Sequence, residues 1–306
     1  MTANQQLDYH IVDVFTTEAL RGNPLAVVFN THGLATGRMQ AIAREFNLSE
    51  TTFIERADPE RERSEGVRVR IFTTQEELPF AGHPTLGTAS VLKRVAPECI
   101  ENGVIKLKLN VGPVPVRFSQ AGSTNGAIFG EMTQRDPEFG AALDPATVAR
   151  LCGLAPGDLD PALPPQVVST GTAFAIVGLR SLEALSRLKV NHDEATPYLK
   201  AHAGRWFYCL APHSEQADDT ATHFRARMQF YGGEDPATGS AAGCAISYLA
   251  RHGAVESDQP VIVTQGVEIG RPSRIHLAAQ RLDTLVTHVR VGGSTVPVAN
   301  GQLFLP

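Results

Sequence analysis

Two similar stretches of this chain carry the side chains best suited to chemistry. Residues 68–94 and 225–251 align without a gap and carry the same residue at eight of twenty-seven columns. This match predicts a duplicated unit of strand, turn and helix. His83 and Asp235 stand at columns where the two copies differ. The shared scaffold therefore does not explain their residue types, and both are candidates for chemistry.

Each copy also places a glycine at the predicted start of its helix, Gly82 before His83 and Gly239 before Ser240. Free backbone N–H groups at a helix N-terminus attract anions, and the helix dipole adds to that attraction. A single turn of this kind is often only scaffold, in which glycine shapes the bend and serine caps the helix. Two such ends facing each other across a cleft predict a clamp for a small anionic ligand.

The glutamates of the repeat favour a structural role. Glu77 and Glu234 occupy the same column, which is typical of a turn carboxylate that accepts from a nearby backbone N–H group. The leucine at position 78 faces Asp235 in the second copy. Asp235 therefore breaks the symmetry where the glutamates keep it.

The elements that position these residues are mostly strands. Alternating or β-branched runs predict strands, and apolar residues at three- and four-residue spacing predict helices. Strands are expected at 9–15, 25–29, 67–72, 105–109, 114–118, 166–169, 174–177, 206–210, 260–265, 274–277 and 285–291, and helices at 37–46, from 83 onward, at 146–151, at 181–188 and after 239. The alternation favours antiparallel sheet with one buried face. An α+β fold in two lobes is the prediction.

Composition excludes several classes of protein. The chain has 306 residues, 42% of them hydrophobic, and a net charge of −5. That length suits two domains, and the charge offers no general affinity for nucleic acid. The N-terminus, MTANQQLDYH, lacks the features of a signal peptide, and no apolar run approaches the ~18 residues of a membrane span. A cytoplasmic protein without membrane contact is expected.

Four long motifs in register resemble one known family. They are NLSETTF at 47–53, ELPFAGHPTLGTA at 77–89, GEDPATGSAAG at 233–243 and QGVEIGRPS at 265–273. Together with DVF, GNPLAVVF and IARE upstream, they resemble the phenazine-biosynthesis PhzF-like proteins over nearly the whole chain.

The resemblance implies a fold similar to that of diaminopimelate epimerase. Each of two pseudo-symmetric lobes is then a curled, mostly antiparallel sheet wrapped around a central helix, with the active site between the lobes. The N-terminal lobe would hold residues 1–127, joined by 292–306, and the C-terminal lobe 128–291. The resemblance also implies a homodimer.

The resemblance further implies an isomerase that needs neither cofactor nor metal. Its activity would be similar to that of trans-2,3-dihydro-3-hydroxyanthranilate isomerase, which relocates a proton on a small carboxylate substrate. Glu50 matches the acid/base glutamate of the family's NLSE motif, and His83 and Asp235 are implied as catalytic partners. Substrate binding falls to Gly82, His83, Gly239 and Ser240. Proton transfer of this kind needs a group that takes a proton and later returns it.

Two alternatives stay open. One is an epimerase or racemase of another small acid; the version with a pair of cysteines is disfavoured, because Ala81 and Thr238 stand before the two glycines. The other is a protein that binds a metabolite without catalysis, which would need the anion clamp but not Glu50. The four cysteines lack CxxC spacing, so buried free thiols are expected.

Overall fold

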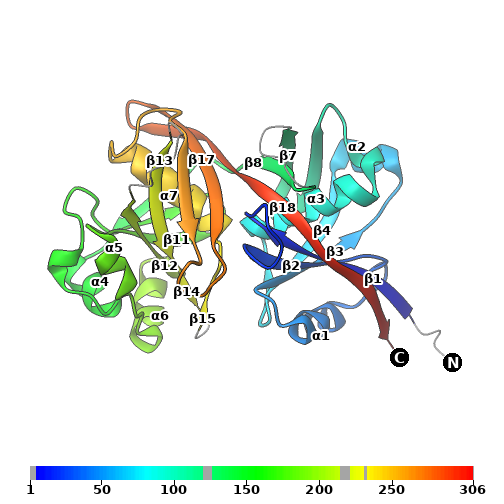
Figure 1. Cartoon of the computed structure of the whole chain (residues 1–306), viewed down its shortest axis with the longest axis horizontal. Coiled ribbons are helices and arrows are strands. Elements are labelled where there is room, and N and C mark those ends of the chain that lie inside the picture. The colour runs from blue at the N-terminus through cyan, green and yellow to red at the C-terminus, as the bar shows by residue number, and fades with distance from the viewer. Residues whose placement is uncertain (1–4, 120–125, 214–220, 231–232, 306) are drawn as a thin grey trace. The chain divides into compact units, whose positions relative to one another are not determined.

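The computed structural model describes residues 5–119, 126–213, 221–230 and 233–305 (Figure 1). Strands dominate a mixed architecture, so the predicted α+β class is confirmed. Contacts divide the chain into two compact units. Unit 1 is Met1–Thr133 with Gly292–Pro306, and unit 2 is Gln134–Val291. The first four residues of the N-terminal stretch weighed as a signal peptide lie outside the described residues.

Unit 1 is a barrel-like sheet. Its strand order is β18, β1, β2, β3, β4, β6, β7, β8, and β8 borders β18 again. The β2–β3 and β4–β6 pairs are parallel. The elements are β1 (Gln5–Val14), β2 (Asn23–Val28), α1 (Thr36–Phe46), β3 (Glu50–Glu55), α2 (Pro59–Glu65), β4 (Val67–Phe72), β5 (Glu77–Leu78), α3 (Gly82–Val95), β6 (Val104–Leu109), β7 (Gly112–Ser119), β8 (Ile128–Thr133) and β18 (Leu285–Leu305).

Helix α3 is the most buried helix segment of unit 1. Every residue from Gly82 to Leu92 is buried, and the helix contacts β1, β2, β3, β6, β7 and β8. Such burial on all sides requires a helix without a polar face. The sequence GHPTLGTASVL meets this requirement with small and apolar residues, and the charged Lys93 and Arg94 come only in its last turn.

Unit 2 has the strand order β9, β10, β11, β12, β13, β16, β17, β18. Helix α7 is buried from Gly239 to Ala250 and contacts β10, β11 and β17. The elements are β9 (Glu138–Ala142), α4 (Pro145–Leu151), β10 (Gln166–Ser169), β11 (Ala173–Gly178), α5 (Leu182–Ser186), α6 (His192–Ala201), β12 (Trp206–Pro212), β13 (Thr222–Arg227), β14 (Gln229–Phe230), β15 (Gly233–Glu234), α7 (Gly239–Arg251), β16 (Val261–Gln265) and β17 (Ser273–Leu282).

The sequence repeat is a structural repeat. The first copy forms β4, β5 and α3, and the second forms β13, β15 and α7, so the predicted unit of strand, turn and helix is confirmed. Each copy contains the same ion pair: Arg70 Nη2 lies 2.6 Å from Glu77 Oε2, and Arg227 Nη2 lies 2.6 Å from Glu234 Oε2. The expected backbone partner was wrong, because an arginine seven residues earlier holds each glutamate.

Several elements differ from the sequence-based expectation, and helix α6 and strand β18 are two of them. Helix α6 was not expected, since Pro197 lies within it and proline interrupts a helical pattern. Strand β18 runs unbroken from Leu285 to Leu305, whereas the strand expected from the sequence covered only 285–291. Its part from Thr295 to Leu305 pairs antiparallel with β1, and Pro297 lies at an irregularity in that register, the kind of position where a sheet tolerates proline.

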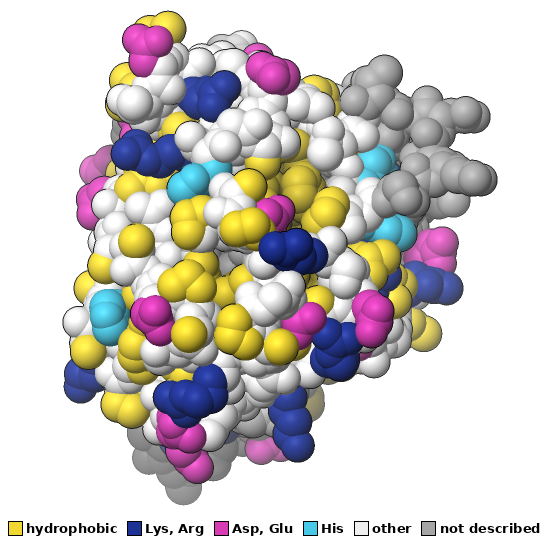
Figure 2. All heavy atoms as spheres, turned by 90° about the vertical axis from the view of Figure 1, so that its left-hand side faces the viewer, with side chains coloured by type: hydrophobic (Ala, Val, Ile, Leu, Met, Phe, Trp, Pro, Cys, Tyr) yellow, Lys and Arg dark blue, Asp and Glu magenta, His cyan; other side chains and the backbone are white. Residues whose placement is uncertain are grey.

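One face of the molecule shows a mixture of side-chain types. On the face drawn in Figure 2, cationic and anionic side chains are interspersed with scattered hydrophobic ones. Among the described residues, no helix is both long and apolar enough to cross a membrane.

Candidate active site

Glu50 stands at the first position of β3, where the chain leaves α1. The helix ends at Asn47, whose φ of 51° turns the backbone out of the helical path. Parallel pairing then places Glu50 beside Leu25 of β2. The side chain is only 10% exposed, so the turn delivers a carboxylate into the interior of unit 1. Burial of an ionisable group needs a compensating partner.

His83, the second residue of α3, lies beside the carboxylate of Glu50. Its Nε2 lies 3.5 Å from Glu50 Oε2, somewhat beyond the usual hydrogen-bond range of about 2.7–3.2 Å. On the other side of the ring, Nδ1 lies 3.1 Å from the amide nitrogen of Asn23 in β2. Three elements far apart in the sequence therefore bring a carboxylate, an imidazole and an amide into one buried line.

The imidazole of His83 is neutral. The ring is 3% exposed, and burial lowers its pKa from 6.5 to about 3 because a charged ring would lose its hydration. At neutral pH His83 therefore acts as a hydrogen-bonding group without a formal charge.

Close packing of α3 on the sheet holds this histidine in place. A Cβ on Gly87 would lie 2.5 Å from Leu25 Cδ2 and 2.8 Å from Val14 Cγ2, so only glycine allows the helix to approach so closely. Gly87 is one helical turn beyond His83 and on the same side. At the next residue, the hydroxyls of Thr88 and Thr52 are 2.8 Å apart and join α3 to β3.

Asp235 lies in unit 2, in the turn between β15 and α7. It is 4% exposed. Its backbone N–H donates to Met228 O at 2.9 Å, and its Oδ2 accepts from Thr238 Oγ1 at 2.6 Å. The sequence singled out Thr238 only because it stands where a cysteine would precede the glycine. In the structure its hydroxyl orients the carboxylate of Asp235.

Gln265 braces this turn from the end of β16. Its Nε2 donates to Asp235 O at 2.8 Å and to Thr238 Oγ1 at 3.0 Å. Its Oε1 accepts from Thr238 N at 3.1 Å and from Tyr208 Oη at 3.1 Å. Burial and the nearby Asp235 raise the pKa of Tyr208, so this phenol keeps its proton and donates. Sequence reasoning missed Gln265 as a supporting residue, although it opens the QGVEIGRPS motif.

The residue after this brace is a glycine for steric reasons. Gly266 has a φ of +78°, and a Cβ there would lie 2.6 Å from Pro236 O and 2.5 Å from Arg271 O. A side chain would be strained by both the backbone angle and the contacts. The motif therefore lets β16 end directly against the turn that carries Asp235.

The predicted binding residues begin the two buried helices. Helix α3 starts with Gly82 and His83, and helix α7 starts with Gly239 and Ser240. No side-chain hydrogen bond caps the N-terminus of either helix. The first N–H groups of a helix have no intrahelical acceptor and suit an anion. Ser240 is buried and is not the cap, since Thr238 precedes the helix. On the α7 side, Gln134 Nε2 donates to Gly239 O at 3.0 Å.

All four cysteines are buried and free, as predicted. Burial raises the pKa of Cys244 to about 11 and that of Cys99 to about 12, so both remain protonated thiols at neutral pH. Among the described residues, no group of three or more His, Cys, Asp or Glu side chains is arranged to hold a metal ion.

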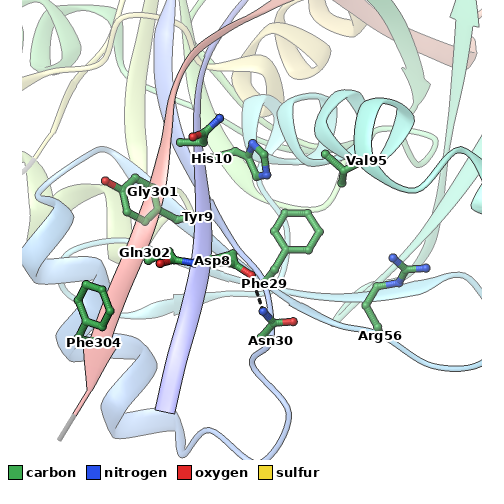
Figure 3. Close-up of a pocket in the computed structure, with 11 residues that line it drawn as sticks. Asp8, Tyr9, His10, Phe29, Asn30, Arg56, Val95, Gly301, Gln302 and Phe304 are labelled. Carbon is green, nitrogen blue, oxygen red and sulfur yellow. Dashed lines mark hydrogen bonds between the residues drawn. The ribbon is translucent and has the colours of Figure 1, made fainter. Parts of the chain in front are cut away.

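A separate groove of about 710 Å³ lies elsewhere on unit 1 (Figure 3). It runs along β1 and the end of β18, where Asn30 Nδ2 donates to Asp8 Oδ2 at 2.7 Å. Neither Glu50 nor His83 lines it. The predicted site residues are therefore not part of this groove.

The fold and these two buried clusters define a mixed α+β protein dominated by sheet. The family model described as Phenazine biosynthesis-like protein matches residues 12–301. A Mesorhizobium japonicum protein named as an uncharacterized isomerase is 37% identical, covering 98% of this chain and 100% of its own. The trans-2,3-dihydro-3-hydroxyanthranilate isomerase of Pseudomonas aeruginosa is 36% identical, covering 97% and 99%.

A solved structure agrees with these relatives. The Bacillus anthracis phenazine biosynthesis protein of the PhzF family superposes with a TM-score of 0.82 at 27% identity, covering 98% of this chain and 99% of that one. The chain therefore belongs to the PhzF-like family of phenazine biosynthesis-like proteins. It is an isomerase.

Proposed function

We propose that this isomerase moves a proton between two carbon atoms of a small carboxylate substrate, with Glu50 as the general acid and base. One observation carries the proposal: a buried carboxylate faces a neutral histidine at 3.5 Å. A carboxylate can take a proton and, as the acid, return it. The substrate resembles trans-2,3-dihydro-3-hydroxyanthranilate, on which the relative of 36% identity is named to act.

The steps balance without a redox partner. The Glu50 carboxylate removes a proton from one carbon, and the electron pair of that C–H bond moves into the adjacent π system. The resulting carboxylic acid exchanges its proton with solvent and then protonates a different carbon. Hydrogen and double bond have changed place, and the enzyme returns to its starting state.

The other predicted residues bind the polar groups of the substrate. The N–H groups that begin α3 at Gly82 and His83 and α7 at Gly239 and Ser240 hold the substrate carboxylate. Asp235, oriented by Thr238, accepts a hydrogen bond from the substrate's amino or hydroxyl group.

The family resemblance supports further parts of the proposal. Each unit is then one copy of a duplicated lobe, a curled sheet around its buried helix α3 or α7, and the protein works as a cytoplasmic homodimer. Equilibrium sedimentation of the purified protein tests the dimer, and a single species of monomer mass would contradict it.

The function is tested by turnover in deuterated water. The purified enzyme is incubated with trans-2,3-dihydro-3-hydroxyanthranilate, and deuterium in the product is located by NMR. Wild type should place deuterium at the new C–H position, and Glu50→Gln should lose about 10²–10⁴-fold in rate, the usual contribution of a positioned acid/base. The matched control is Glu45→Gln, at an exposed position of α1.

Other outcomes identify the alternatives. Deuterium at the original carbon with inverted configuration would indicate an epimerase. Ligand binding without exchange in any variant would indicate a binding protein. If the Glu50→Gln variant exchanged deuterium as fast as the Glu45→Gln control, Glu50 would not be the acid/base.

A further inference from the structure

Asn23 is a buried amide that the mechanism above does not use. It is the first residue of β2 and is fully buried. Its Nδ2 lies 3.1 Å from His83 Nδ1. An amide nitrogen carries two hydrogens and accepts none, so the Nδ1 atom must present a lone pair to it.

The opposite side of the ring requires the same proton arrangement. Nε2 faces Glu50 Oε2 at 3.5 Å, and an ionised carboxylate only accepts hydrogen bonds. A proton on Nε2 satisfies that contact. With the proton on Nδ1, an N–H would face the amide hydrogens of Asn23, and the lone pair of Nε2 would face the carboxylate. Two independent contacts therefore select one neutral tautomer.

The backbone fixes the amide of Asn23 in this position. Gly22, just before it, has a φ of +68°, and a Cβ there would lie 2.3 Å from Val14 O. Asn23 itself pairs with Val14 of β1, and Pro24 follows with Asp13 opposite. The tight turn thus delivers the amide from a rigid strand.

We propose that Asn23 is a positioning residue that holds His83 as the Nε2–H tautomer, with that hydrogen aimed at the Glu50 carboxylate. This role rests on the proposed function of Glu50. This contact of 3.5 Å steadies the carboxylate in the orientation from which it takes the substrate proton. When Glu50 becomes protonated, Nε2–H is released and can donate to the negative charge that develops on the substrate.

Ring ¹⁵N NMR of the wild-type protein tests the tautomer without any substitution at the site. With ¹⁵N-labelled histidine at pH 7, His83 should show a protonated Nε2 and an unprotonated Nδ1; its signals are assigned by their loss in His83→Gln. A protonated Nδ1, alone or together with Nε2, would overturn the proposal.

The variant Asn23→Asp tests the consequence. A carboxylate beside Nδ1 attracts the proton to that nitrogen, so the Nδ1 signal should become protonated. The kcat should fall at least about 10-fold, as for other residues that orient a catalytic group, while KM stays within ~3-fold because Asn23 does not touch the substrate. Asn102→Asp makes the same change at an exposed turn and should keep both the wild-type spectrum and kcat.

The outcomes separate this inference from the proposed function. A changed tautomer with unchanged kcat would overturn the positioning role, and so would an unchanged tautomer in Asn23→Asp. Exchange that persists in Glu50→Gln would overturn the function of Glu50 while the spectrum of His83 still reports its tautomer.

Discussion

The buried histidine predicts how the stability of the protein depends on pH. Burial lowers the pKa of His83 from 6.5 to about 3. In the unfolded chain the ring binds a proton below pH 6.5, whereas in the folded protein it stays neutral down to about pH 3. Between these values the unfolded state holds one more proton, so stability rises with pH. The contribution is fully present above pH 6.5 and is lost as the pH falls towards 3.

The magnitude follows from the size of the shift. One pH unit within the window is worth about 1.4 kcal/mol. Lowering the pH from 7 to 4.5 should therefore cost about 2.5 kcal/mol through His83 alone. Carboxylates remote from the ring also titrate in this range, but they contribute equally to the wild type and to a variant that lacks only this ring.

Urea denaturation followed by circular dichroism measures the effect. The free energy of unfolding is determined at pH 7 and 4.5 for the wild type and for His83→Gln, whose side chain does not titrate. The variant should lose about 2.5 kcal/mol less than the wild type over this interval. His32→Gln, at an exposed position, should keep the wild-type dependence. Equal losses in wild type and His83→Gln would refute the argument that burial excludes the charged ring.

Two further predictions concern packing and charge in unit 2. Gly243→Ala should lower the free energy of unfolding, measured by urea denaturation, by about 1–3 kcal/mol, because its Cβ would lie 1.9 Å from Gln134 Oε1 and displace a hydrogen-bonded amide. The control Gly37→Ala has open space around its Cβ. It should leave the free energy of unfolding unchanged or raise it by up to ~1 kcal/mol. Glu234→Ala should lower the free energy of unfolding by about 3–5 kcal/mol, because its side chain is 7% exposed and its loss leaves the charge of Arg227 buried without its partner. Glu77→Ala should lower it clearly less, because the side chain of Glu77 is 23% exposed. Equal losses within either pair would contradict the prediction.

Local sequence was sufficient for the repeat and for naming the candidate site residues. The eight shared columns already place the turns before Gly82 and Gly239, because turn and helix-start chemistry depends on neighbouring residues. The predicted partner of Glu77 was wrong because its actual partner depends on strand pairing, which local sequence does not show. Arg70 reaches it across the β4–β5 pair, a contact that requires the strands to be paired.

The supporting residues depended on distant contacts. Asn23 lies sixty positions before the histidine it contacts, and Gln265 lies twenty-seven positions after Thr238. In the sequence Asn23 is one letter of a turn, GNP, and Gln265 is the last residue of a strand. Only the fold, which brings β2 to α3 and the end of β16 to the turn before α7, turns these amides into hydrogen-bonding partners.

The sequence by itself determined the family, the duplicated unit and the positions of Glu50, His83 and Asp235. These follow from residue types at fixed spacing, which are properties of the chain alone. The tertiary structure decided that His83 is neutral, that its ring faces Glu50, and that Thr238 orients Asp235. The physical reason is that pKa values and hydrogen bonds depend on burial and on atoms within a few ångströms, and folding brings those atoms from distant parts of the chain.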